Sequence, residues 1–197
     1  SFDVNVKELI IPPVKKTGQT KSYNTYALEV TDGSLKDDGF YQKGVDHNYT
    51  RDDTNNIVTD HVTGLMWQDD ANVSSVEKRW LTNENYTTCS NDTNSPACYD
   101  TSGDTAATYC SELTLGGYTD WRLPTVEELR GIADYGKTIP AIDTTYFQNV
   151  TSSHYWSSTT HKDYKSKAWD VNFYYGNDNY AYKSNNNYFV RCVRAGE

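Results

Sequence analysis

The chain has little positive charge and no long hydrophobic run. Its 197 residues include 18 Lys and Arg against 27 Asp and Glu, which gives a formal net charge of −9. Nucleic acids, heparin-like polyanions and anionic membranes each require a basic patch, so the charge argues against them as principal partners. No apolar stretch approaches membrane-spanning length, so no transmembrane segment is expected. No charged-then-apolar leader is present, and we expect that any signal sequence is absent from this chain.

Sequence motifs of catalysis and metal binding are also missing. The 4 histidines, His47, His61, His154 and His161, form no His-Glu-x-x-His motif. There is no Gly-x-Ser-x-Gly elbow and no phosphate-binding glycine loop. The turn-rich stretch 32–39 lacks the alternating ligands and closing Glu of an EF-hand. The Glu-Pro-Asn and Trp-Asn-Asp triplets of calcium-dependent lectins do not occur either. We therefore expect no enzymatic activity, no metal and no cofactor.

The 4 cysteines show no Cys-x-x-Cys spacing and have no histidine beside them at zinc-ligand spacing. Four cysteines allow three pairings. We favour Cys89–Cys98, which closes a short polar loop, together with Cys110–Cys192, which ties a helix to the last strand. The alternative is four reduced, buried thiols. Disulfides require an oxidising compartment, so this pairing predicts a secreted, periplasmic or cell-surface protein.

Tyrosine is abundant, with 17 residues, and it concentrates with asparagine near the C-terminus. Most residues from Asn172 to Tyr188 are one or the other. Tyr supplies large amphipathic rings and Asn adaptable hydrogen bonds, the combination typical of antibody contact surfaces. The run ends at 189–193, Phe-Val-Arg-Cys-Val, which is typical of a buried strand. The pattern predicts a contact surface on a fixed scaffold. The alternative is the solvent face of an edge hairpin, but clustered exposed aromatics usually mark a contact surface.

The length fits one domain. Residues 1–22 are interpreted as an N-terminal extension or edge strand, and 23–197 as the domain. Strands are expected at 57–60 and 65–68, followed by a polar excursion over 69–101. Apolar spacing and capping residues predict helices over 104–114 and from the Thr125 capping box to Gly136. Strands then follow at 154–158, 168–173 and 189–193. Helices followed by an antiparallel sheet predict the α+β class.

Alternation in the strand 168–173 predicts two faces. Trp169, Val171 and Phe173 are expected on one side, and Asp170, Asn172 and Tyr174 on the other.

Four ordered motifs resemble the Lcl C-terminal domain family: Thr63-Gly64-Leu65-Met66-Trp67-Gln68; Asp120-Trp121-Arg122-Leu123-Pro124-Thr125 with Glu128-Leu129; Tyr155-Trp156-Ser157-Ser158; and Val190-Arg191-Cys192-Val193-Arg194. The resemblance implies a C-type-lectin-like fold, related to formylglycine-generating enzymes. In this fold two helices flank a twisted, mostly antiparallel sheet, and the domain is loop-rich and disulfide-stabilised. Trp121, Arg122 and Trp156 would then be scaffold, with Arg122 contributing a buried, hydrogen-bonded guanidinium.

Residues 160–188 also resemble the variable region of proteins diversified by bacterial and phage retroelements, which mutate adenines in a target gene. The resemblance implies a variable ligand-binding protein of receptor or adhesin type, acting on a protein or glycan of another cell or surface. Trp169, Val171, Phe173, Gly176 and Val190 would be fixed. The candidate ligand-contacting positions are Thr160, His161, Asp163, Tyr164, Asp170, Asn172, Tyr174, Tyr175, Asn177, Asp178, Asn179, Tyr180, Tyr182, Asn185, Asn186, Asn187 and Tyr188.

Two alternatives remain open at this point. The chain could be a fixed glycan-binding adhesin domain, because Tyr and Asn suit sugars as well as proteins. It could also be an oxidase like the formylglycine-generating enzymes, which use a cysteine pair. The expected positions of Cys110 and Cys192, on a helix face and in a core strand, suit a structural bridge better than a reactive thiol. A monomer and a trimer are both compatible with the sequence.

Overall fold

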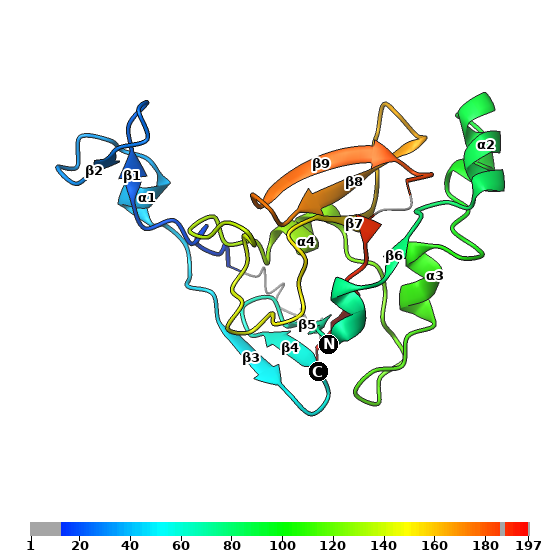
Figure 1. Cartoon of the computed structure of the whole chain (residues 1–197), viewed down its shortest axis with the longest axis horizontal. Helices are drawn as coiled ribbons and strands as arrows, with labels where there is room; N and C mark the ends of the chain where they lie inside the picture. The colour runs from blue at the N-terminus through cyan, green and yellow to red at the C-terminus, as the bar shows by residue number, and fades with distance from the viewer. Residues whose placement is uncertain (1–12, 186–187, 197) are drawn as a thin grey trace, which may run out of the picture.

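The computed structural model describes residues 13–185 and 188–196. Short strands and helices alternate along the chain (Figure 1). The elements are β1 (Ser22–Tyr23), β2 (Glu29–Val30), α1 (Asp38–Tyr41), β3 (Tyr49–Asp52), β4 (Ile57–Asp60), β5 (Leu65–Gln68), η1 (Ala71–Ser74), β6 (Glu77–Lys78), α2 (Asn83–Asn91), η2 (Pro96–Cys98), α3 (Ala106–Ser111), α4 (Val126–Arg130), β7 (His154–Thr160), β8 (Lys167–Asn172), β9 (Asn177–Tyr182), β10 (Tyr188–Phe189) and β11 (Val193–Ala195).

The strands form three sheets. A two-stranded sheet joins β1 and β2, a five-stranded sheet has the order β6-β10-β7-β8-β9, and a four-stranded sheet has the order β11-β5-β4-β3. Every strand pair is antiparallel except β10 with β7. The α+β class and the mostly antiparallel pairing are therefore confirmed.

The N-terminal part stands apart from the larger sheets. In Figure 1, β1, β2 and α1 form a small blue lobe to one side of the body. A strap leads from this lobe to the body, where Lys15 pairs with the buried Asp60 of β4 and forms a bridge with Val45. Residues 1–12 of the expected N-terminal extension or edge strand lie outside the described residues.

The helices follow their caps. Thr125 caps α4 by accepting from the Glu128 N–H, and the Glu128 carboxylate accepts from the Thr125 N–H, as the capping box predicts. α4 is nevertheless shorter than expected and ends at Arg130. α2 was missed, because the polar excursion shows no apolar stripe. Only Cys89 of that helix is buried, and its start is fixed by the Thr82 cap.

The last predicted strand, 189–193, is divided between two sheets. β10 ends at Phe189 and pairs with β6 and β7, whereas β11 begins at Val193 and pairs with β5. Between them the chain crosses from one sheet to the other. At the crossing, the Gln68 side-chain oxygen accepts from the Cys192 N–H and the Cys192 carbonyl accepts from the Gln68 N–H. The apolar run thus marks burial correctly, but burial alone does not distinguish one strand from a crossing.

The core has two parts. One packs Trp67, Leu129 and Phe147 against the inner faces of the sheets, and the other gathers Trp121 and Trp156 around the disulfides. Both tryptophans are therefore scaffold, as expected.

Both predicted disulfides are present, Cys89–Cys98 and Cys110–Cys192. They indicate an oxidising compartment. No helix in the described part of the chain has the length and hydropathy to cross a bilayer.

The expected burial of Arg122 is wrong. Its guanidinium is about half exposed and binds both oxygens of Glu128, at 2.7 and 2.6 Å. Within the family motifs the fully buried guanidinium is that of Arg191, and Arg194 is buried as well. Sequence reasoning chose the arginine within the Trp-Arg-Leu-Pro motif, but that position lies at the surface before α4, whereas Arg191 lies at the crossing between the sheets.

Candidate ligand-binding surface

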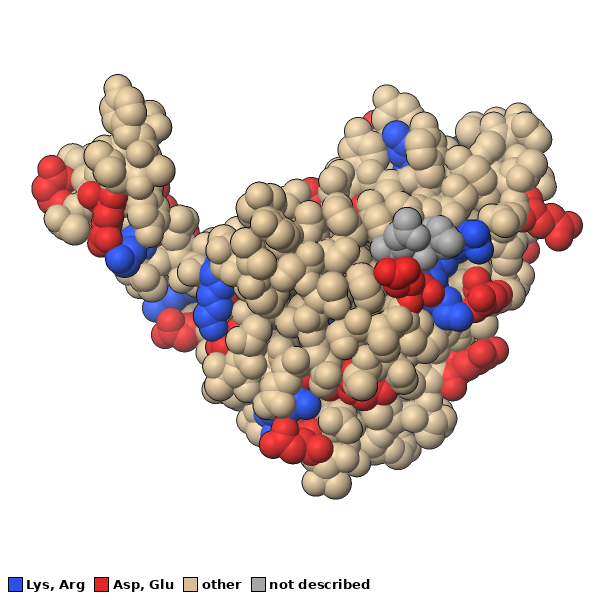
Figure 2. Space-filling model, in the orientation of Figure 1, with Lys and Arg blue, Asp and Glu red and all other residues tan. Residues whose placement is uncertain are grey.

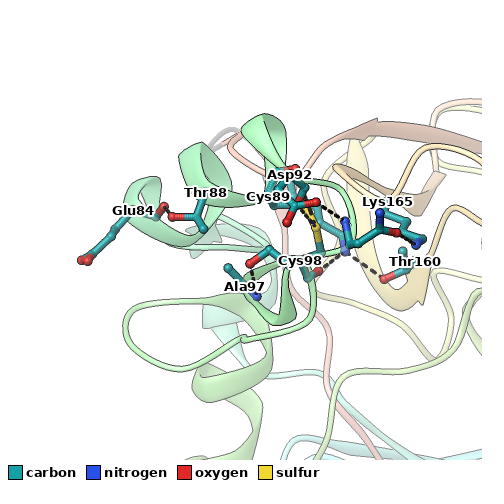
Figure 3. The surroundings of a disulfide bond; sticks show 11 residues. Glu84, Thr88, Cys89, Asp92, Ala97, Cys98, Thr160 and Lys165 are labelled. Atoms are coloured by element: carbon teal, nitrogen blue, oxygen red, sulfur yellow. Dashed lines mark hydrogen bonds between the residues drawn. A yellow bond between two sulfur atoms is a disulfide. The ribbon is translucent and has the colours of Figure 1, made fainter.

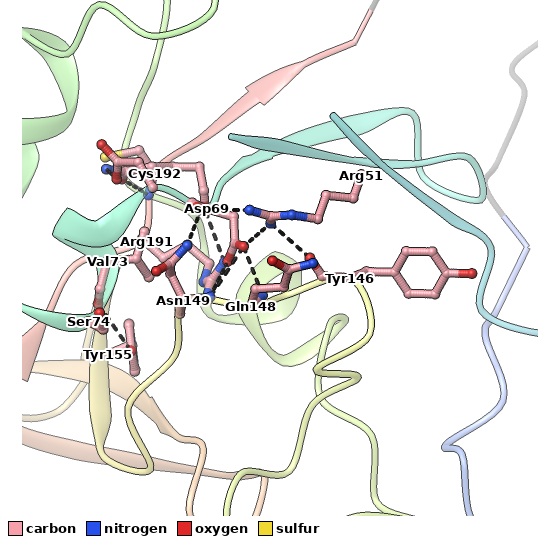
Figure 4. Close-up of polar contacts among 12 residues, drawn as sticks. Arg51, Asp69, Val73, Ser74, Tyr146, Gln148, Asn149, Tyr155, Arg191 and Cys192 are labelled. Atoms are coloured by element: carbon pink, nitrogen blue, oxygen red, sulfur yellow. Dashed lines mark hydrogen bonds and ion pairs between the residues drawn. The ribbon is translucent and has the colours of Figure 1, made fainter. Parts of the chain in front are cut away.

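A buried polar network around Asp69 forms the frame of the domain (Figure 4). Asp69 lies at its centre and is fully buried. Its carboxylate pairs with Arg191 at 2.8 Å and with Arg51. It also accepts from the Gln148 N–H at 2.8 Å. Arg191 donates further to the carbonyls of Gln68 and Asn149. One carboxylate thereby joins β3, the end of β5, the 146–149 segment and the crossing before β11.

The hairpin β8–β9 carries most of the Asn/Tyr run. The two strands pair in continuous register from Lys167 opposite Tyr182 to Asn172 opposite Asn177. β9 is the edge of the five-stranded sheet, and five of its six side chains are exposed. Gly176 in the connecting turn has φ +81°, and a Cβ there would meet the Ala141 Cβ at 3.2 Å. The turn therefore requires glycine, whereas the outward side chains of β9 are free of the core.

Aromatic rings from β8, β9 and the turn before β8 meet at one end of this hairpin. We call the group His161, Tyr164, Trp169, Tyr180 and Tyr182 the aromatic surface. The His161 ring stacks on Trp169 at 5.1 Å between centroids and meets the edge of Tyr180 at 4.6 Å. Trp169 and Tyr180 are direct cross-strand partners. The Tyr164 and Tyr180 rings stack at 6.4 Å between centroids. Tyr164, Tyr180 and Tyr182 are 54%, 40% and 55% exposed, so all three rings still meet solvent.

The turn 161–166 is held in place by its own histidine. The Nδ1 atom of His161 accepts from the backbone N–H groups of Asp163 and Tyr164, both at 3.2 Å. The backbone N–H of His161 donates to the Lys167 carbonyl and closes the turn. His161 is therefore a positioning residue as well as part of the surface, because its ring nitrogen orders the segment that presents Tyr164.

Trp169 lies on the same face as Val171 and Phe173, as alternation predicts, but its surroundings differ from theirs. Val171 and Phe173 are fully buried, but Trp169 is only half-buried and packs on His161 and Tyr180. All three side chains lie on the same face by alternation. α4 packs against the β7–β8–β9 face, and its ion pair with β9 joins Arg130 to Asp178, which lies opposite Val171. Trp169 lies two residues before Val171 in β8, beyond this ion pair, and belongs to the aromatic surface.

Asp170 does not point outward as expected but is fully buried. Its Oδ1 atom lies 2.6 Å from the Nδ1 atom of His154. Burial raises the pKa of Asp170, although the hydrogen bond and charge of His154 oppose the shift. The Tyr188 ring stacks on His154 at 4.7 Å and packs on Trp156. Burial and the nearby Asp170 raise the pKa of Tyr188 to about 12. Asp170 and Tyr188 therefore pack the other face of the sheet.

Lys183 lies within the Asn/Tyr run but is fully buried. Its Nζ atom donates to the Cys98 carbonyl and, at 2.9 Å, to the Thr160 hydroxyl. It also lies 3.8 Å from the centre of the Trp80 ring. Figure 3 shows where the Cys89–Cys98 bridge and Thr160 approach each other. Burial lowers the pKa of Lys183 to about 7. Thr160 is a candidate ligand-contacting residue, but its hydroxyl already accepts the hydrogen bond from Lys183.

The predicted positions fall into four groups. Exposed are Asp163, Tyr164, Tyr175, Asn177, Asp178, Asn179, Tyr180 and Tyr182; half-buried are Thr160, His161, Asn172, Tyr174, Asn185 and Tyr188; Asp170 is buried; and Asn186 and Asn187 lie outside the described residues. Tyr174 and Tyr175 contact each other at the turn, away from the aromatic surface. Sequence reasoning missed Lys167 and Trp169, and the alternation that places them beside Tyr180 was the available signal.

No three His, Cys, Asp or Glu side chains meet as a possible metal site within residues 13–185 and 188–196. The side chains that come together at the aromatic surface are aromatic rings and a lysine, groups that can stack and donate hydrogen bonds.

The structure thus defines a disulfide-stabilised α+β domain with an exposed aromatic surface on one sheet edge. The family model of the Lcl C-terminal domain matches residues 56–194. The match runs from the start of β4 into β11 and covers well over half of the chain, so the chain belongs to the Lcl C-terminal domain family. The comparison with curated proteins found no match.

Proposed function

We propose that this chain is a ligand-binding protein of receptor or adhesin type, secreted or displayed at a cell surface, that binds with the aromatic surface. One observation carries the proposal: Tyr164 and Tyr180 remain exposed while packed around His161 and Trp169, and the exposed Tyr182 follows Tyr180 on the same continuous strand ladder. Rings held in this way contribute large contact area at low entropic cost. Exposed aromatic groups of this size mark contact surfaces rather than packing.

A C-type-lectin-like scaffold with a diversifiable face is the finer part of the proposal. Exchange of the exposed β9 side chains leaves the backbone ladder and the Asp69 network untouched, which supports diversification at these positions. Asp170 is excluded from the exchangeable set, because it is buried against His154. The DNA beside the gene tests this part. A near-identical template repeat and a reverse transcriptase gene are expected, and related copies that vary evenly along the chain would contradict it.

Binding without catalysis fits the cysteine chemistry. All four cysteines are joined in disulfides, and Cys110 and Cys192 are fully buried. An oxidase of the formylglycine-generating type requires accessible thiols. Titration of the native protein with a thiol reagent should therefore detect none, and two reactive thiols would revive the oxidase alternative.

The binding proposal is tested with two probes, a glycan array and a phage-displayed random peptide library. Selected binders should lose about 2 kcal/mol, or about thirtyfold in affinity, on Tyr180→Ala. Tyr26→Ala is the matched control, because Tyr26 is 83% exposed on the separate N-terminal lobe. The free energy of unfolding of Tyr180→Ala, measured by thermal denaturation, should differ from that of wild type by about 1 kcal/mol or less. No binders from either probe, or equal loss in both variants, would contradict the proposal.

A further inference from the structure

Positive charge gathers beside the aromatic surface although the chain as a whole is acidic. The segment 162–167 carries Lys162, Lys165 and Lys167 against one acid, Asp163, in a chain of net charge −9. Lys165 already donates to the Asn94 side-chain oxygen at 3.1 Å. Figure 2 shows cationic atoms surrounded by uncharged atoms over the turn that joins β7 to β8 in Figure 1.

Lys167 lies among the rings themselves. Its Nζ atom is 5.1, 5.0 and 4.6 Å from the ring centres of Tyr164, Tyr180 and Tyr182. Across the described ranges it forms no ion pair and no side-chain hydrogen bond. The acids of the hairpin are engaged elsewhere, Asp170 with His154 and Asp178 with Arg130. Three tyrosine rings therefore hold the ammonium in place, and its N–H groups remain available to a ligand.

Resting on the binding function proposed above, we propose that Lys167 selects a protein ligand that presents a carboxylate beside an apolar side chain. The carboxylate pairs with Lys167, and the apolar neighbour packs on Tyr180 and Trp169. A charged group placed inside an apolar surface gives orientation and specificity, because a neutral ligand group there would leave the ammonium desolvated without a partner.

The charge around the site favours a single carboxylate over a polyanion. Acidic side chains outnumber basic ones in the whole chain, so an extended polyanion would meet repulsion beyond the 162–167 segment. One Asp or Glu of a peptide needs only the one ammonium. The rings flanking Lys167 also provide the apolar contact that a peptide side chain, but not a hydrated polyanion, would use.

The test selects a phage-displayed random peptide library on wild-type protein, Lys167→Met and Lys36→Met. Lys36 is the matched control, because its Nζ atom lies 3.8 Å from the Phe40 ring centre on the N-terminal lobe. Peptides selected on wild type and Lys36→Met should be enriched in Asp or Glu next to an aromatic or aliphatic residue. The enrichment should disappear on Lys167→Met and persist on Lys167→Arg.

A double-mutant cycle with one selected peptide then isolates the pair. Replacing the peptide's Asp by Asn should weaken binding to wild type about tenfold and binding to Lys167→Met hardly at all. Equal loss on both proteins, or selection without acidic preference, would overturn the role of Lys167 and leave the binding function standing. Absence of any selected peptide alongside glycan-array binding would overturn the peptide ligand, and absence of both would overturn the binding function itself.

Discussion

The Asp69 network and the aromatic surface use polar and aromatic groups in opposite ways. Asp69 and Arg191 are fully buried, and their charges are paired with each other and hydrogen-bonded to the backbone. Tyr180 and Lys167 lie at the edge of the other sheet, and their contacts leave faces and donors open to solvent. The groups of the Asp69 network are already engaged and can form few new interactions. The exposed groups of the aromatic surface can still form most of theirs. A change in the first region should thus cost stability, and a change in the second should cost binding.

Asp69→Asn should give the largest loss of stability. It removes the countercharge of the buried Arg191 guanidinium and one of the two carboxylates paired with Arg51, and should cost about 3–5 kcal/mol in the free energy of unfolding. Urea unfolding followed by circular dichroism measures the loss. Asp163→Asn, an exposed change on the turn before β8, should alter stability by about 0.5 kcal/mol or less. Equal losses in the two variants would erase the contrast between frame and surface.

Removal of the short disulfide should have an intermediate effect. Cys89→Ser with Cys98→Ser opens a loop with a sequence separation of 9 and should cost about 2–3 kcal/mol. Because the Cys98 carbonyl accepts from Lys183, the β9 end of the surface should loosen as well. Amide hydrogen exchange should rise at Lys183 and remain unchanged at Arg191. Faster exchange at both would show that the bridge supports the whole frame.

Lys183 should give the smallest effect over any single pH unit, seen as a pH dependence of the free energy of unfolding. Burial lowers its pKa from 10.5 to about 7, so between these values the unfolded chain holds a proton that the folded chain has lost. The stability of wild type relative to Lys183→Met should therefore rise with pH from about 7 to 10, by at most about 1.4 kcal/mol per pH unit. Lys162→Met, an exposed change, should track wild type. A flat difference between wild type and Lys183→Met would show a normal pKa.

The fold class, the disulfides and the surface could be predicted to different degrees. The α4 cap was readable, because Thr125 and Glu128 specify it locally. Both cysteine pairs followed from loop composition and expected elements. α2 and the division of 189–193 could not be read, since a polar helix and a buried crossing have no distinctive periodicity. Tertiary packing decides both.

The same limit applies to the candidate site. Asn and Tyr content located the exposed hairpin, but alternation alone could not show which part of a sheet face α4 covers. Val171 is therefore core while Trp169, two residues before it, joins the surface. Asp170 was misplaced for a related reason. Its short polar side chain matches the variable positions, and only the proximity of His154 explains its burial.

The crossing at 190–192 has a further consequence for how a ligand would be met. The buried residues Val190, Arg191 and Cys192 connect the two large sheets along the chain. The disulfide from Cys192 to Cys110 holds this segment in place. This short buried link and the disulfide restrain relative movement of the two sheets, which argues against capture of a ligand by clamping. On the binding function proposed above, the hairpin is already folded before it meets a ligand. Association should therefore lose entropy mainly from side-chain rotamers, with fast, single-phase kinetics.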